Sequence, residues 1–194
     1  MIGTLIELQR LKSLDRTGWV LRGLPPGTES VASHSFGVGV TVMFLADRLV
    51  AGGTHVDIAR LLRMALLHDW AEARIGDMPR TGTRYFGQEA RRDAELKAFA
   101  DIVEGTALNE IYVELFDDYE QRATLEARLV KAADVIDLLV QVLALERAGY
   151  RGLDEFWEVT GAMDFRLDGV AHDLVSEMID HLLTARADVL ARNI

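Results

Sequence analysis

The chain has 194 residues, of which 49% are hydrophobic and 27% charged, values typical of one globular domain and not of a disordered or fibrous chain. The absence of cysteine excludes a disulfide scaffold, a thiol nucleophile and a cysteine-based zinc or iron–sulfur site. A formal net charge of −10 repels polyphosphate at long range, so we expect no nucleic acid polymer as a partner, whereas a small phosphorylated substrate held by a few arginines is compatible.

The N-terminal segment MIGTLIELQRLK lacks the basic stretch followed by an apolar stretch that marks a signal peptide. The longest apolar stretch, residues 38–45 (VGVTVMFL), is far shorter than a membrane-spanning helix. We therefore expect a cytoplasmic protein that has no membrane partner.

Apolar residues recur every three or four positions in eight segments, a spacing that predicts helices. These segments are residues 4–14, 31–51, 56–75, 88–103, 108–119, 124–148, 153–159 and 167–191. Glycine and proline lie between them: Pro25-Pro26-Gly27 interrupts residues 15–30, Gly52-Gly53 closes the second helix, and Pro79 lies in an expected loop. Because no segment alternates like a strand, we predict an all-α fold of about eight helices in one domain spanning residues 1–194.

His68 and Asp69 are polar residues at the end of an apolar helical run, residues 61–67. A buried carboxylate costs several kcal/mol unless a cation or strong donors compensate it. Glu72 adds a second acid one helical turn after His68. The alternative is a hydrogen-bonded core histidine whose acidic neighbours face solvent near the helix end.

His34 and Asp134 repeat the anomaly on two other apolar helices. His34 lies in the first turn of the segment 31–51, and Asp134 lies midway along the segment 124–148, with Asp137 one turn further. His34 alone is explained as a satisfied core histidine, whereas two aspartates on or beside the apolar face of one helix need a reason, and a metal ion is the commonest. Together with His68-Asp69, His34 and Asp134 supply two imidazoles and two carboxylates, a mixed set that suits one divalent metal ion such as Co, Mn, Fe, Ni, Zn or Mg.

The order His, His-Asp, Asp on a helical chain resembles the HD superfamily of metal-dependent phosphohydrolases. Four segments are more specifically similar to its 5′-deoxynucleotidase branch: LKSLDRTGWVLRG, ESVASHS, ALLHDWAEARIGDMPR and VKAAD. Members of this branch hydrolyse deoxyribonucleoside 5′-monophosphates to nucleoside and phosphate with a divalent metal, commonly as homodimers. The resemblance therefore implies an HD-type helical domain, this substrate, one metal ion and a homodimer.

The resemblance also assigns roles to individual residues. It places the metal ligands at His34, His68, Asp69 and Asp134. Glu72 matches the acid beside the attacking water, and Asp77, a candidate for both catalysis and substrate binding, matches the acid at the sugar-phosphate end. Arg16 and Trp19 match the arginine and tryptophan that face the nucleotide, although Trp19 could equally cap the core or lie at a dimer interface.

These residues can support hydrolysis of a phosphomonoester. A bound metal ion lowers the pKa of water and stabilises phosphoryl oxygens. Glu72 can take or position the proton of that water. Arg16, and Arg22 in the same loop, can clamp phosphate oxygens through charge-assisted hydrogen bonds.

Two other interpretations fit the pattern. Other HD branches cleave cyclic dinucleotides, alarmones or dNTPs, or oxidise substrates at two irons. The dinuclear branches need further histidines before the final aspartate, and none lies between Asp69 and Asp134, which favours one metal ion. The chain could also be a catalytically silent helical dimer that binds a nucleotide or metal, but the presence of Glu72 and Asp77 argues against this.

Overall fold

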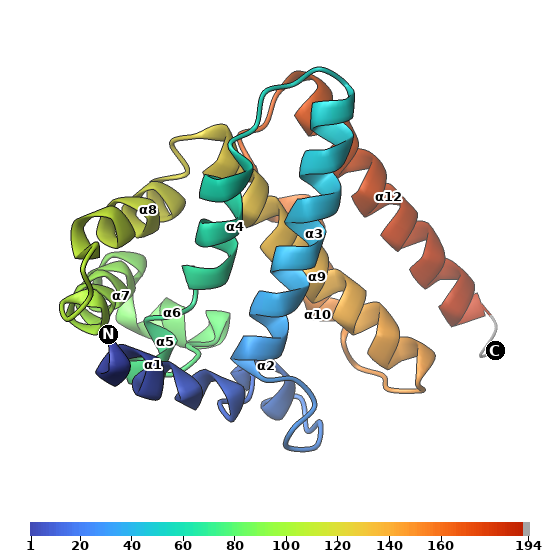
Figure 1. The fold of residues 1–194 in the computed structure, drawn as a ribbon. Helices are drawn as coiled ribbons and strands as arrows, with labels where there is room; N and C mark the ends of the chain where they lie inside the picture. Colours follow the sequence, from blue (N-terminus) through green and yellow to red (C-terminus); the bar gives the residue numbers. More distant parts are fainter. Residues whose placement is uncertain (192–194) are drawn as a thin grey trace.

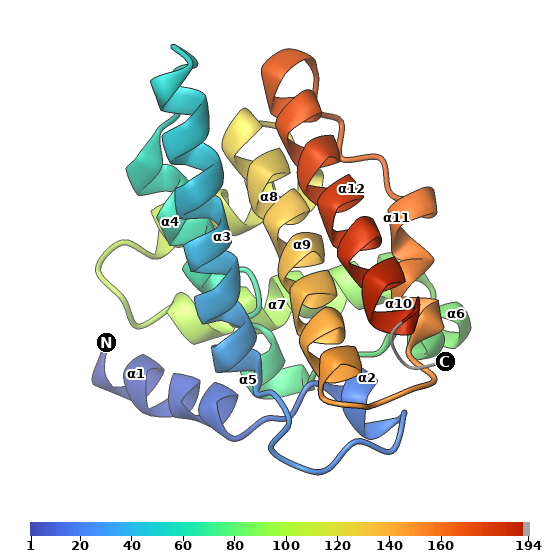
Figure 2. The ribbon, with the colours of Figure 1, turned by 90° about the vertical axis from the view of Figure 1, so that its right-hand side faces the viewer.

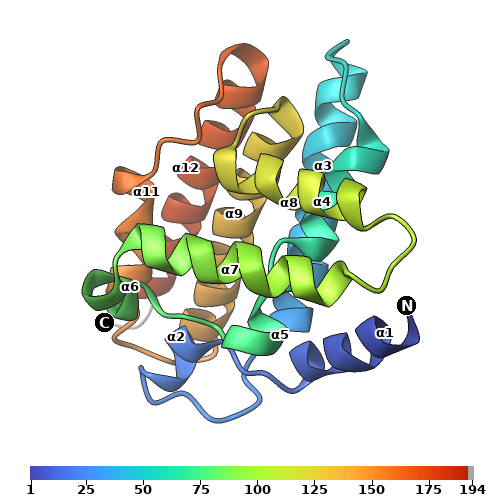
Figure 3. The same ribbon diagram turned by 90° about the vertical axis from the view of Figure 1, so that its left-hand side faces the viewer.

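Helices α3 (Val31–Ala51) and α9 (Leu125–Arg147) run through the centre of the computed structural model, which describes residues 1–191, and a third long helix, α12 (Gly169–Ala191), lies at its edge (Figure 1). They lie side by side along one face (Figure 2). On the other side, α4 (Ile58–Leu67) and α8 (Asn109–Gln121) pack on α9, and α7 (Gln88–Val103) crosses beside α8 (Figure 3).

Shorter elements surround this bundle. They are α1 (Ile2–Leu8), the 3₁₀ helix η1 (Gln9–Lys12), α2 (Thr17–Val20), α5 (Glu72–Ile75), α6 (Arg80–Phe86), α10 (Asp154–Trp157) and α11 (Val159–Ala162). Apart from an isolated β-bridge between Asp15 and Ser30, the described residues contain no β-structure, which confirms the all-α prediction.

Side-chain caps explain where the main helices begin. The Ser30 hydroxyl accepts a hydrogen bond from the Ser33 amide at the start of α3. Asp57 does the same for α4, and Thr124 for α9. Each such cap contributes about 1 kcal/mol to helix stability. The predicted range 31–51 therefore coincides with α3, and Gly52 follows its last residue as expected.

The described residues form twelve α-helices and one 3₁₀ helix, more than the eight or so predicted, and they depart from the predicted elements in five places. Helix α2 lies within residues 15–30, where no helix was predicted, and the predicted helix 153–159 divides into α10 and α11. The first predicted helix, residues 4–14, is α-helical only as far as Leu8, continues as the 3₁₀ helix η1 and ends at Lys12. The segment 56–75 divides into α4 and α5, because tight turns such as Trp70 N to Leu67 O, 3.0 Å, replace the α-helical pattern after Leu67. The expected loop over 76–87 contains α6, which starts directly after Pro79, where proline costs no helical hydrogen bond.

Helix α3 is buried on one side only, whereas its composition predicts burial on nearly all sides. Val38, Val42 and Leu49 are fully buried, but Phe36 is 71% exposed and Phe44 is 65% exposed. By length and composition α3 could also cross a membrane, yet its buried side packs on α4 and α9 as a core helix does.

The apolar core has two parts that share α9. The larger cluster gathers side chains from α3, α4, α7, α8 and α9, including the stacked rings of Phe99 and Phe116, 4.1 Å apart. The smaller cluster joins α9 to α2 and α10 through Trp19, Leu139 and Trp157. Because α9 packs in both clusters, its position is fixed from two sides.

Asp118, buried near the end of α8, connects three helices. Its carboxylate accepts hydrogen bonds from Arg60 of α4, at 2.6 Å, and from the amide of Thr124, at 3.0 Å, where α9 begins. Burial alone would raise the pKa of Asp118, but the hydrogen bonds from Arg60 and Thr124 outweigh it, and the pKa lies below the ordinary 3.8.

We predict that Asp118→Asn lowers the free energy of unfolding by about 1.5–3 kcal/mol at pH 7, because hydrogen bonds to a charged group are lost. A depressed pKa stabilises the fold above the ordinary value of 3.8, and this contribution disappears as the pH falls through the folded-state value. Urea unfolding at several pH values measures both effects. The control is Asp93→Asn, at an exposed position of α7, and a wild-type advantage that persists undiminished at pH 2 would contradict the assignment.

Candidate metal centre

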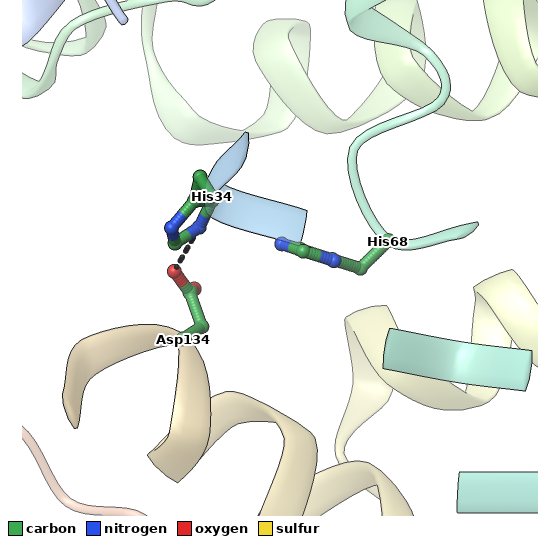
Figure 4. A group of neighbouring side chains, drawn as sticks. All are labelled: His34, His68 and Asp134. Atoms are coloured by element: carbon green, nitrogen blue, oxygen red, sulfur yellow. Dashed lines mark hydrogen bonds and ion pairs between the residues drawn. The ribbon is translucent and has the colours of Figure 1, made fainter. Parts of the chain in front are cut away.

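Four side chains from three helical segments meet where α3, α4 and α9 come together. They are His34 in the first turn of α3, His68 and Asp69 directly after α4, and Asp134 near the middle of α9. Figure 4 shows His34, His68 and Asp134 directed toward one another, and one donor atom from each lies within 4.8 Å of the other two. Asp69 Oδ2 is 3.1 Å from His68 Nε2 and 3.8 Å from His34 Nε2.

His68 presents a free nitrogen to this cluster. Its Nδ1 lies 2.8 Å from the carbonyl oxygen of Ala65, so Nδ1 carries the proton and Nε2 carries a lone pair. Within the described residues, Nε2 is buried and has no hydrogen-bond partner, and it faces a carboxylate oxygen of Asp69. Two acceptors facing each other repel unless a cation lies between them, so the donor set fits a divalent metal ion.

Both nitrogens of His34 contact aspartates. Nε2 lies 3.1 Å from Asp134 Oδ1, and Nδ1 lies 2.8 Å from Asp137 Oδ2. Burial and the charge of Arg16 lower the pKa of His34, but the hydrogen bonds to the two aspartates outweigh them and raise it to about 9. Without a metal ion, the ring therefore holds a proton on each nitrogen.

Cations from three elements surround the acidic groups. Burial raises the pKa of Asp69, but His68, which is protonated at the low pH where Asp69 titrates, together with His34 and Arg16, outweighs this effect and lowers it. The pKa of Asp134 is likewise held well below its ordinary value, chiefly by Lys131, whose Nζ lies 2.7 Å from Oδ2. Both carboxylates are therefore ionised and available as ligands.

Asp134 Oδ2 also accepts a hydrogen bond from Tyr119 of α8, at 3.3 Å. Lys131 and Tyr119 thus occupy one oxygen of Asp134 and leave Oδ1 directed at His34. The sequence analysis missed both residues. The three-residue spacing of Lys131 and Asp134 on one helix was a usable signal, whereas nothing local points to Tyr119.

Glu72 lies beside the cluster at the start of α5. Its side chain is buried, and Oε2 has no hydrogen-bond partner among the described residues. Burial, followed by the charges of Asp69 and Asp77, raises the pKa of Glu72 well above its ordinary value. The raised pKa shifts this carboxyl group toward its protonated form, the direction that proton transfer by a general acid requires.

Two predicted substrate-binding residues lie on adjacent loops. Arg16 is largely buried, with its guanidinium 3.4 Å from Asp69 Oδ2. Asp77 accepts a hydrogen bond from the amide of Thr17, at 2.6 Å, while the Thr17 hydroxyl donates to the Asp77 carbonyl oxygen, at 2.7 Å. Thr17, which the sequence analysis did not select, therefore joins the loop of Arg16 to the loop of Asp77.

Trp19 and Arg22 have protein partners. Trp19 is only 2% exposed, its ring lies 4.6 Å from that of Phe156, and its Nε1 donates to Glu29 at 2.7 Å. This placement agrees with the alternative in which Trp19 caps the core, and its role toward the nucleotide stays a prediction. Arg22 forms an ion pair with Glu155, so its binding to phosphate also stays a prediction.

Comparison with known proteins gives consistent matches. A family model described as HD domain matches residues 8–161. The 5′-deoxynucleotidase YGK1 of Saccharomyces cerevisiae is 32% identical over 84% of this chain and 74% of its own length. The 5′-deoxynucleotidase hdd1 of Schizosaccharomyces pombe is 30% identical over 92% and 86%. A conserved hypothetical protein from Pyrococcus furiosus has a similar structure, with a TM-score of 0.81, 34% identity and coverage of 95% and 99%.

Proposed function

Because the chain belongs to the HD domain family, we propose that it is a metal-dependent 5′-deoxynucleotidase, which converts deoxyribonucleoside 5′-monophosphates to deoxynucleosides and phosphate. The observation that carries this proposal is the buried, unpartnered Nε2 of His68 facing Asp69 beside a largely buried arginine, Arg16. The two yeast relatives named 5′-deoxynucleotidases support the substrate class.

The proposed ligands of one divalent ion are His34, His68, Asp69 and Asp134. When bound, such an ion lowers the pKa of a water molecule and stabilises negative charge on the phosphoryl oxygens. Nitrogen and carboxylate donors in equal number are compatible with Co, Mn, Fe, Ni, Zn or Mg.

The remaining residues bind the phosphate and move the proton. Arg16 donates to phosphoryl oxygens and shares its charge between them and Asp69. Glu72 takes the proton of the attacking water on its free Oε2. As the water oxygen bonds to phosphorus and the bond from phosphorus to the 5′-oxygen breaks, a carboxyl with a raised pKa can return that proton to the leaving oxygen.

Substrate selectivity follows from the loops beside the metal centre. Asp77, held by Thr17, borders the sugar, and the buried ring of Trp19 supports the loop from beneath. An additional 2′-hydroxyl would have to fit against this wall or remain unpaired. The loops present no asparagine- or glutamine-rich segment that could distinguish the bases.

We predict that kcat/KM for dAMP exceeds that for AMP by up to about 100-fold, the limit for a wall that excludes a hydroxyl group. Values for dTMP and dGMP should lie close to that for dAMP. Phosphate release measured with each nucleotide under one metal tests this, and EDTA should abolish the activity until metal is restored. Equal or faster hydrolysis of AMP would reject the role of Asp77 at the sugar and that of Trp19 in supporting its wall.

We predict that Glu72→Ala retains the metal ion and the fold but lowers kcat by about 10²–10⁴-fold, because a general acid or base is lost. Metal content and kcat are measured on the same preparation. Glu89→Ala, on the exposed side of α7, is the matched control and should be fully active. If Glu72→Ala kept its turnover, the proton-transfer role would pass to Asp77.

We also expect a homodimer, and the outer face of α3 supports it. Phe36, Met43, Phe44 and Val50 are all exposed on this helix, and exposed apolar side chains gathered on one element often mark a protein–protein contact. A second copy of the chain would bury these side chains. Light scattering should give twice the 21.6 kDa of one chain for the wild type and a monomer for Phe44→Asp.

The control for this prediction is Ile111→Asp on α8, which exposes a comparable apolar side chain, 41% against 65% for Phe44. It should remain dimeric. A wild-type mass of one chain, or an unchanged mass for Phe44→Asp, would show that the outer face of α3 is not a homodimer interface.

A further inference from the structure

Gly37, one turn after His34 on α3, lies directly against α9. A Cβ atom at Gly37 would stand 2.0 Å from Asp137 Oδ1 and 2.6 Å from Asp137 Cγ. Both distances are shorter than non-bonded contacts to a Cβ atom allow. At Gly39, two residues further, a Cβ atom would have no described atom within 4 Å apart from its chain neighbours and the backbone of α3 itself. The three atoms nearest to a Cβ atom at Gly37 all belong to the Asp137 carboxylate, so an alanine at position 37 would force this carboxylate to move.

The carboxylate that occupies this space contacts His34. Asp137 Oδ2 lies 2.8 Å from His34 Nδ1, whereas Asp134, one turn earlier on α9, lies 3.1 Å from Nε2 of the same ring. The two ring nitrogens point in diverging directions. An ion bound at Nε2, where His68 and Asp69 also converge, is therefore out of reach of Asp137.

Glu29 is a second acidic residue beside Asp137. One ligand atom from each of Glu29, His34 and Asp137 lies within 4.8 Å of the other two. Glu29 already accepts a hydrogen bond from Trp19 at 2.7 Å. Nδ1 of His34 has Asp137 as its hydrogen-bond partner. Because these atoms satisfy one another, the group needs no ion of its own.

We propose that Asp137 is a positioning residue for the metal centre and that Gly37 is the residue that makes room for it. Asp137 accepts the Nδ1 proton of His34, so when a metal ion binds it is Nε2 that loses its proton and directs a lone pair at the ion. This inference rests on the proposed metal-dependent function. Loss of such a partner behind a histidine ligand typically weakens metal affinity by about 10–100-fold.

The experiment is a titration of the metal-free protein with Co²⁺ in competition with a chromophoric chelator. Asp137→Ala and Gly37→Ala should each weaken Co²⁺ binding by about 10–100-fold. Asp137→Asn, which keeps an acceptor oxygen but not the charge, should lose less. Gly39→Ala is the matched control and should bind Co²⁺ as the wild type does. Thermal unfolding of each metal-free variant checks the fold.

Two further measurements separate positioning from ligation. The double variant Gly37→Ala/Asp137→Ala should bind no more weakly than Asp137→Ala, because the added methyl group no longer meets a carboxylate. The visible absorption spectrum of saturating Co²⁺ should be the same in Asp137→Asn and the wild type, because the donor atoms are unchanged. A changed spectrum, or two Co²⁺ ions bound per wild-type chain, would make Asp137 a ligand and overturn the inference.

The outcomes distinguish this inference from the proposed function. If the wild type binds one Co²⁺ and Asp134→Ala does not, while Asp137→Ala binds as tightly as the wild type, the inference fails and the metal centre stands. If the wild type binds no Co²⁺, the metal centre and the inference fail together. If Gly37→Ala does not fold, the two Asp137 variants still decide the question.

Discussion

The structure depends on keeping several carboxylates ionised at the junction of α3, α4 and α9. Asp69 and Asp134 are each only 16% exposed there, and an uncompensated charge at such a depth would cost several kcal/mol. Arg16 and Lys131 supply part of the compensation. The loop that carries Arg16 is held beside the segment that precedes α3 by a hydrogen bond from the Arg16 amide to the Glu29 carbonyl oxygen, at 3.0 Å.

The same electrostatic cost explains why the site residues could be predicted from the sequence. His34, His68 and Asp134 stand out because polar side chains on apolar helix faces are rare unless they have partners. The structure brings all three together, and it places Glu72 beside them. The extent of α3 was also predictable, because Ser30 caps its first turn and two glycines follow its last residue.

Features that depend on contacts between distant elements could not be predicted in this way. The division of the segment 56–75 follows from turns that bring His68 and Asp69 into the junction, and helical periodicity alone continues through it. The exposure of Phe36 depends on which face of α3 the other helices cover. The contact of Thr17 with Asp77 joins residues 60 positions apart, so no local pattern announces it.

In the proposed enzyme, metal binding and nucleotide binding depend on different parts of the fold. Lys131, Asp134 and Asp137 follow one another at three-residue steps on α9, so a small rotation of this helix would move all three away from His34 and its neighbours together. Packing of α9 in both parts of the core prevents that rotation. The residues proposed to face the nucleotide, Arg16 and Asp77, lie instead on connecting segments tied by a few hydrogen bonds. Substitutions in these segments can therefore alter the choice of substrate while the helices hold the metal ligands in place.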